Sequence, residues 1–169
     1  TAILVAVMLI VIITTIQQLY ETAFQQASNQ LVETAKSQAR LIESTVSNSL
    51  KNKPTPYTAE TEAVALALIR QTFQGNRGFG QTGEFALAKK VGNKLQFLLG
   101  HQHINTESTK LVKHDYFAAP MQRALAGESG TMITVDYQGQ QILAAYQPVT
   151  VFNYGIVAKV DLSELRKPF

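Results

Sequence analysis

The 169-residue sequence contains no cysteine, and only 16% of its residues carry a charge. Without cysteine, the chain cannot be a small domain held together by disulfides. The charged fraction is well below the ~25% of an ordinary soluble domain. The shortage is concentrated at the start of the chain, where Glu21 is the first charged residue, and it excludes a purely soluble enzyme and a disordered chain.

Clusters of positive charge are also missing, although the formal net charge is +3. Lys and Arg residues occur singly or in pairs along the whole sequence. A nucleic-acid surface needs these side chains gathered on one face or along one helix. We therefore expect no nucleic-acid partner.

The longest apolar run is Ala2 to Ile13, at the start of the chain. As a helix, residues 1–16 span roughly 24 Å, somewhat short of the ~30 Å hydrocarbon core of a membrane. We expect them to be the end of a longer transmembrane helix that anchors the chain in a membrane. A signal-peptide core and a buried helix of a soluble protein are the alternatives. The first lacks its basic n-region, and the second is usually apolar on one stripe only.

The positions of the first basic residues indicate the orientation of this helix. No Lys or Arg precedes Lys36, whereas cytoplasmic flanks usually carry them within ~15–20 residues of the membrane. The part of the chain after Ile16 is therefore expected to be extracytoplasmic.

A long membrane-proximal signalling and dimerisation helix is predicted for residues 17–53. Residues 17–50 contain no Gly or Pro, and apolar residues recur there at spacings of three or four. The stripe consists of Phe24, Ala27, Leu31, Ala35, Ala39, Ile42, Val46 and Leu50. Its alanines allow a close approach, either to the chain's own domain or to a second copy in a dimer seam. Both kinds of contact can occur at different positions along the helix, and we expect a homodimer along it.

The remaining residues, 54–169, are predicted to form a separate domain. Pro54 and Pro56 stop the long helix, because proline cannot continue it. A short amphipathic helix follows, capped at its start by Thr58 and ended by Gly75.

Beyond Gly75 the pattern is typical of β-strands. Alternating apolar residues predict two hairpins, which turn at residues 91–93 and 138–139, and a final strand over residues 156–160. A short helix, opened by Pro120 and closed by Gly127, separates the hairpins. These elements predict an α+β fold, in which the long N-terminal helix precedes a five-stranded antiparallel sheet with short flanking helices.

Two motifs resemble catalytic or binding sites without the structural context that such sites need. Residues 78–83 match the glycine spacing of nucleotide-binding loops, but a helix precedes them and a strand follows, which is the reverse of the required order. His101, His103 and His114 could ligate a metal, yet scattered His residues in a polar loop are more often solvated or bind an anion. We expect no catalytic residues, no metal and no cofactor in this part of the protein.

Four runs in the second half carry a family resemblance. They are TGEFALAKKVGNKLQFLLGHQ, PMQRALAGESG, VDYQGQQILAAYQPV and YGIVAKVDLSEL. Over residues 79–169 the chain resembles the Cache-type, PAS-like extracytoplasmic sensor domains of bacterial transmembrane receptors, which include histidine kinases, diguanylate and nucleotide cyclases and chemoreceptors. The resemblance implies that residues 54–169 form a PAS-like Cache domain facing the periplasm or the exterior, anchored in the inner membrane.

The resemblance also implies a small-molecule pocket between one face of the sheet and the segment 101–123. Cationic side chains there would hold an anionic ligand, and aromatic side chains would form apolar walls. The candidate ligand-binding residues are Arg77, Phe85, His101, His103, Lys113, Tyr116, Met121, Tyr137, Tyr146 and Lys159. The expected function is a non-catalytic, ligand-sensing input domain that relays a conformational change across the membrane. The alternative is a ligand-free structural or protein-interaction domain.

Overall fold

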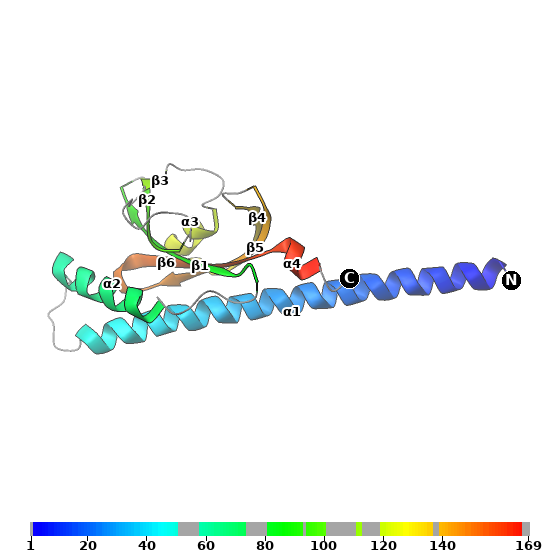
Figure 1. The fold of residues 1–169 in the computed structure, drawn as a ribbon, viewed down its shortest axis with the longest axis horizontal. Helices are drawn as coiled ribbons and strands as arrows, with labels where there is room; N and C mark the ends of the chain where they lie inside the picture. Colours follow the sequence, from blue (N-terminus) through cyan, green and yellow to red (C-terminus); the bar gives the residue numbers. More distant parts are fainter. Residues whose placement is uncertain are drawn as a thin grey trace.

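The computed structural model describes residues 2–50, 58–73, 81–92, 94–100, 111–112, 119–136 and 139–166. A long helix runs beneath a twisted sheet, with short helices at the side of and above the sheet (Figure 1). The predicted α+β class is confirmed.

Helix α1 extends from Ala2 to Leu50 without interruption. Its 49 residues give a rod of about 74 Å. Residues 2–19 are exposed, and their composition is apolar enough to cross a membrane. From Leu31 onward, every third or fourth side chain of the helix is buried. One helix therefore includes both the predicted membrane segment and the predicted membrane-proximal segment.

Within the described residues, six antiparallel strands form a single sheet in the order β3-β2-β1-β6-β5-β4. The strands are β1 (Glu84–Val91), β2 (Lys94–Leu99), β3 (Leu111–Val112), β4 (Gly130–Val135), β5 (Gln141–Val149) and β6 (Tyr154–Asp161). The five predicted strands correspond to β1, β2, β4, β5 and β6. The two-residue β3 is an addition, because it is too short to produce an alternating pattern.

Three short helices complete the described chain. They are α2 (Ala59–Phe73), α3 (Ala119–Leu125) and α4 (Leu162–Arg166), and a 3₁₀ turn η2 (Val151–Asn153) joins β5 to β6. The predicted N-cap of α2 is confirmed, since Thr58 Oγ1 accepts a hydrogen bond from the backbone N–H of Thr61 at 3.3 Å. Helix α4 directly continues β6, and it lies beside α1 on the side from which the apolar segment leaves the domain (Figure 1).

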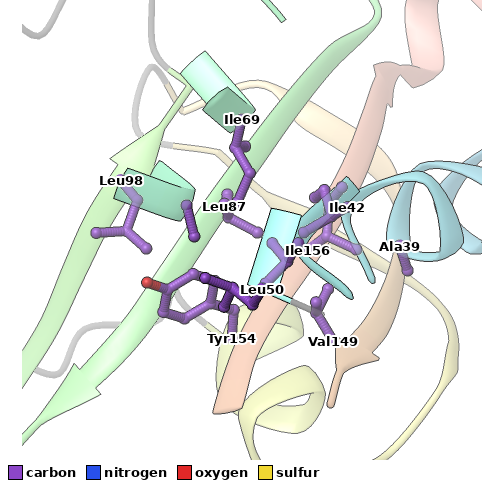
Figure 2. Close-up of a cluster of buried hydrophobic side chains, with 11 residues drawn as sticks. Ala39, Ile42, Leu50, Ile69, Leu87, Leu98, Val149, Tyr154 and Ile156 are labelled. Carbon is purple, nitrogen blue, oxygen red and sulfur yellow. The ribbon is translucent and has the colours of Figure 1, made fainter. Parts of the chain in front are cut away.

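The main core lies between the sheet and helices α1 and α2. Ile42 and Val46 of α1 meet Ile69 of α2 and the strand residues Leu87 and Ile156 in one buried cluster (Figure 2). A second cluster, nearer the apolar segment, joins Leu31 and Ala35 of α1 to β5 and β6. The alanine positions of the stripe allow α1 to lie close to the sheet, as the sequence predicts.

This packing limits where a dimer seam can lie. Six members of the predicted stripe are 4% exposed or less against the chain's own domain. They are Leu31, Ala35, Ala39, Ile42, Val46 and Leu50. Over residues 31–50 the stripe is therefore occupied by the sheet and cannot also contact a second copy.

A partly buried ionic contact fixes α2 to the sheet. The carboxylate of Glu62 accepts hydrogen bonds from Lys89 Nζ at 2.5 Å and from Tyr154 Oη at 2.7 Å. Burial raises the pKa of Glu62, but these two bonds outweigh it and leave the pKa below its ordinary value. Burial and the bond to Glu62 both raise the pKa of Tyr154, which therefore stays protonated. Lys89 and Tyr154, on the α1 side of the sheet, therefore serve to attach α2.

Candidate functional site

The opposite face of the sheet, covered by α3, is the candidate site; we call it the α3 face. In an antiparallel sheet, residues directly opposite each other on neighbouring strands point to the same side. The pairing registers thus define rows of side chains that cross the α3 face. One row is Gly130, Tyr146, Val157 and Ala86, and the next is Met132, Ala144, Lys159 and Glu84. The second row is the charged one, and it lies closer to α4.

Helix α3 is seated on Gly155 of β6. A Cβ atom at Gly155 would lie 2.9 Å from both Ala124 Cβ and Met121 Sδ, and 3.2 Å from Leu125 Cγ. Met121 is only 2% exposed and belongs to the apolar cluster between α3 and the sheet. The glycine therefore sets how closely α3 approaches the sheet.

Tyr146 lies between this apolar contact and the charged row. Its ring is buried in the same cluster as Met121, and its hydroxyl accepts a hydrogen bond from Arg123 Nη1 at 3.2 Å. The Arg123 guanidinium also lies 5.9 Å from the centre of the Tyr146 ring and 3.9 Å from the Glu128 carboxylate. The Arg123 side chain remains about half exposed. Arg123 thus places a cation at the rim of the α3 face.

Lys159 is the central residue of the charged row. Its Nζ donates a hydrogen bond to Asp136 Oδ2 at 3.0 Å and lies 3.2 Å from Glu84 Oε2. Its side chain is 13% exposed and that of Asp136 6%. Burial lowers the pKa of Lys159, but the bond to Asp136 and the charge of Glu84 together raise it above its ordinary value. Lys159 is therefore a paired, charged lysine.

The surroundings of Lys159 contain more negative than positive charge. Asp161, further along β6, has a raised pKa because of burial and of repulsion by Asp136. Within the described part of the chain, no group of three or more His, Asp or Glu side chains is placed to hold a metal ion. Because two carboxylates neutralise Lys159, this lysine does not offer the free positive charge that the sequence led us to expect. Arg123 is better placed to meet an anion.

The structure brings three of the predicted site residues together. Met121, Tyr146 and Lys159 all lie on the α3 face. Phe85 lies on the other face, where its ring contacts Phe73 of α2 edge-on at 6.5 Å. Its neighbour Glu84 points to the α3 face instead, because side chains alternate along a strand. The other six, Arg77, His101, His103, Lys113, Tyr116 and Tyr137, lie outside the described residues.

Four residues of the site were not among the predicted ones. Glu84 and Asp136 pair with Lys159, Arg123 bonds Tyr146, and Gly155 seats α3. The sequence contains one usable signal, since Glu84 and Lys159 each alternate with apolar residues and are therefore on a definite face of a strand.

Comparison with known proteins finds weak structural similarity to the sensor domains of two receptors. No family model matches the sequence, and no curated protein matches it. The sensor domain of the V. cholerae histidine kinase DctB is 13% identical with a TM-score of 0.40, over 83% of this chain and 60% of that chain. The ligand-binding domain of the Campylobacter jejuni chemoreceptor Tlp3, solved in complex with L-valine, is 10% identical with a TM-score of 0.40, over 88% and 65%. Another structure of the Tlp3 sensory domain is 9% identical with a TM-score of 0.31, over 88% and 66%.

All three structures are sensor domains. They come from a histidine kinase and a chemoreceptor. The present chain spans 60–66% of the length of these chains. At these identities and TM-scores, the likeness assigns no ligand to the present chain.

Proposed function

We propose that this chain is the extracytoplasmic ligand-sensing input domain of a bacterial inner-membrane receptor, of the histidine kinase, cyclase or chemoreceptor type. One observation carries the proposal: a single helix links the apolar segment to the sheet. Residues 2–19 of α1 are exposed and apolar, and residues 31–50 form the core with β5 and β6. A shift of the sheet relative to α1 therefore reaches the membrane along a continuous rod.

The α3 face is the better candidate for the ligand side. The α1 face is closed by a 20-residue stretch of helix and by α2, with large aliphatic side chains between the layers (Figure 2). The α3 face is covered by the seven residues of α3, and next to this helix it presents a phenol, a guanidinium and a buried ion pair. Small-molecule sites commonly combine apolar walls with a few placed polar groups of this kind. Ligand binding there would favour one of two arrangements of the sheet against α1.

A thermal-shift screen of the full chain in detergent tests the proposal. The panel should contain amino acids, organic acids, amines and nucleobases, because the site offers both signs of charge and an aromatic ring. A compound at 100 times its Kd adds ~2.7 kcal/mol to the free energy of unfolding, or about 5–10 °C in Tm for a domain of this size. If no compound in the panel raises the Tm, the sensing proposal is contradicted.

A negative screen would favour the alternative function, a structural or protein-interaction domain without a ligand. This alternative is supported by the packing of Met121 and Tyr146, which already fill the space between α3 and the sheet. The alternative predicts that a partner protein, rather than a metabolite, raises the Tm.

The homodimer belongs to the same proposal and is confined to the exposed part of α1. Because residues 31–50 are packed on their own sheet, pairing is proposed through residues 2–19, inside the membrane. Sedimentation of the full chain in detergent measures it directly, and a purely monomeric species would contradict a stable dimer.

A further inference from the structure

The contact between α4 and the start of β1 has the geometry of a latch. The Glu164 carboxylate of α4 accepts three hydrogen bonds: from Gln81 N at 2.9 Å, from Thr82 N at 2.8 Å and from Thr82 Oγ1 at 2.5 Å. Thr82 Oγ1 in turn accepts a bond from Asp161 N at 3.0 Å. Bonds to an ionised acceptor are stronger than those between neutral groups, so a single carboxylate fixes α4 to the residues that precede β1.

Helix α4 also contacts the long helix. Leu165 of α4 and Phe24 of α1 pack against the same buried cluster, which contains Leu31 and Ala35 of α1. In the fold, α4 lies beside α1 at the end of the domain from which the exposed apolar segment leaves (Figure 1). Helix α4 therefore contacts α1 at the point where α1 leaves the domain and its exposed apolar segment begins.

The charged row of the α3 face includes Glu84, which is close in sequence to the residues that bond Glu164. Glu84, which lies 3.2 Å from Lys159 Nζ, is two residues from Thr82, a distance of about 7 Å in extended backbone. Lys159 Nζ lies 3.0 Å from Asp136 Oδ2 and 3.2 Å from Glu84 Oε2, so it links the start of β1 to the residue that follows β4. A group that binds Glu84 or Lys159 would move β1 relative to β6 next to the latch.

We propose that Glu164 is a conformational latch and that the contacts of Lys159 with Glu84 and Asp136 control it from the α3 face. A change in these contacts shifts the start of β1, alters the three bonds to Glu164 and changes the separation of α4 and α1. The inference rests on the proposed function only in naming the α3 face as the side where a ligand acts. The coupling itself is a property of the ligand-free chain.

The test measures the latch and the helix separation in the ligand-free full chain. Amide hydrogen exchange at Gln81 and Thr82 reports on the latch. Because the chain has no cysteine, Gln26→Cys and Ser163→Cys place two spin labels at exposed positions of α1 and α4, and their separation can be measured by pulsed EPR. Glu164→Gln is expected to speed exchange at Gln81 and Thr82 by about 10-fold or more, because charge-assisted bonds are lost. It should also broaden the distribution of label distances.

Coupling is tested by Glu84→Gln, a substitution that keeps the shape of the side chain and removes its charge. We expect exchange at Gln81 and Thr82 to rise about 3- to 10-fold, with a shifted label distance. Glu43→Gln is the matched control, because the Glu43 carboxylate accepts bonds from Thr150 N at 2.9 Å and Thr150 Oγ1 at 2.6 Å, far from α4. It should speed exchange at Thr150 only.

Two results would overturn the proposal. The first is that Glu84→Gln leaves amide exchange at Gln81 and Thr82 and the label distances as in wild type. Glu164 would then be a structural contact that the α3 face does not control. The other is a change in label distance with Glu43→Gln as large as that with Glu164→Gln. Since no ligand is present, neither result depends on whether the thermal-shift screen succeeds.

Discussion

Replacing Gly155 with valine is expected to displace α3 and to lower the free energy of unfolding by about 1–3 kcal/mol or more. The backbone of Gly155 does not require glycine, since its φ lies outside the positive range. The cost comes from space: a Cβ there would lie 2.9 Å from Ala124 Cβ, which cannot yield unless the helix backbone moves. Chemical denaturation of the full chain measures the loss.

Two further variants separate packing from other effects. Gly155→Ala combined with Ala124→Gly returns most of the space, so the pair should be less destabilising than the sum of the two single changes. Gly92→Ala meets no atom within 4 Å and tests backbone strain alone, because φ is +59° there. If Gly155→Val were no worse than Gly92→Ala, α3 would not be seated as described.

Removing the ammonium of Lys159 is expected to cost more. Lys159→Met leaves the buried carboxylate of Asp136 and that of Glu84 without their shared cation, and breaking a buried pair from one side costs about 3–5 kcal/mol. Lys36→Met is the control, because Lys36 and Glu33 form an exposed pair at 3.7 Å, and such surface pairs contribute about 0–1 kcal/mol. Equal losses from the two variants would contradict the buried-pair description.

The pH dependence of the Lys159 effect has a definite sign. The pKa of Lys159 is raised in the folded state, so its stabilising contribution is complete below the pKa of an unfolded lysine, 10.5. The contribution is lost as the pH rises through the higher folded pKa. The difference in stability between wild type and Lys159→Met should therefore be constant from pH 7 to about pH 9 and shrink only above pH 10.5. Adding Asp136→Asn to Lys159→Met should recover part of the loss.

The sequence was sufficient for the longer elements because each of them has a local signal. The apolar run and the spacing of the stripe from Leu31 to Leu50 predict α1, and the predicted stripe residues from Leu31 onward are buried in the structure. Thr58 predicts the start of α2. Helix α4 gave no signal, because five residues are too few for a helical period.

The site was harder to predict because it depends on the pairing of distant strands. Phe85 and Leu87 on one face of β1 and Ala86 and Ala88 on the other are all apolar, so the sequence does not show which face α1 covers. Asp136 has the turn role expected at a strand end, since its Oδ1 accepts a bond from Gln140 N at 3.0 Å. Its second bond, to Lys159, spans 23 residues and follows only from the sheet register.

The central claim, that a small molecule binds on the α3 face, is tested most directly by calorimetric titration of the strongest compound from the screen. The titration compares wild type with Tyr146→Phe and Tyr154→Phe, which each lose one phenol hydrogen bond, to Arg123 on the α3 face and to Glu62 on the α1 face respectively. We expect binding to wild type, affinity weakened about 3- to 10-fold by Tyr146→Phe and unchanged affinity in Tyr154→Phe. Absence of binding to wild type, or a loss of affinity in Tyr154→Phe as large as in Tyr146→Phe, would contradict the central claim.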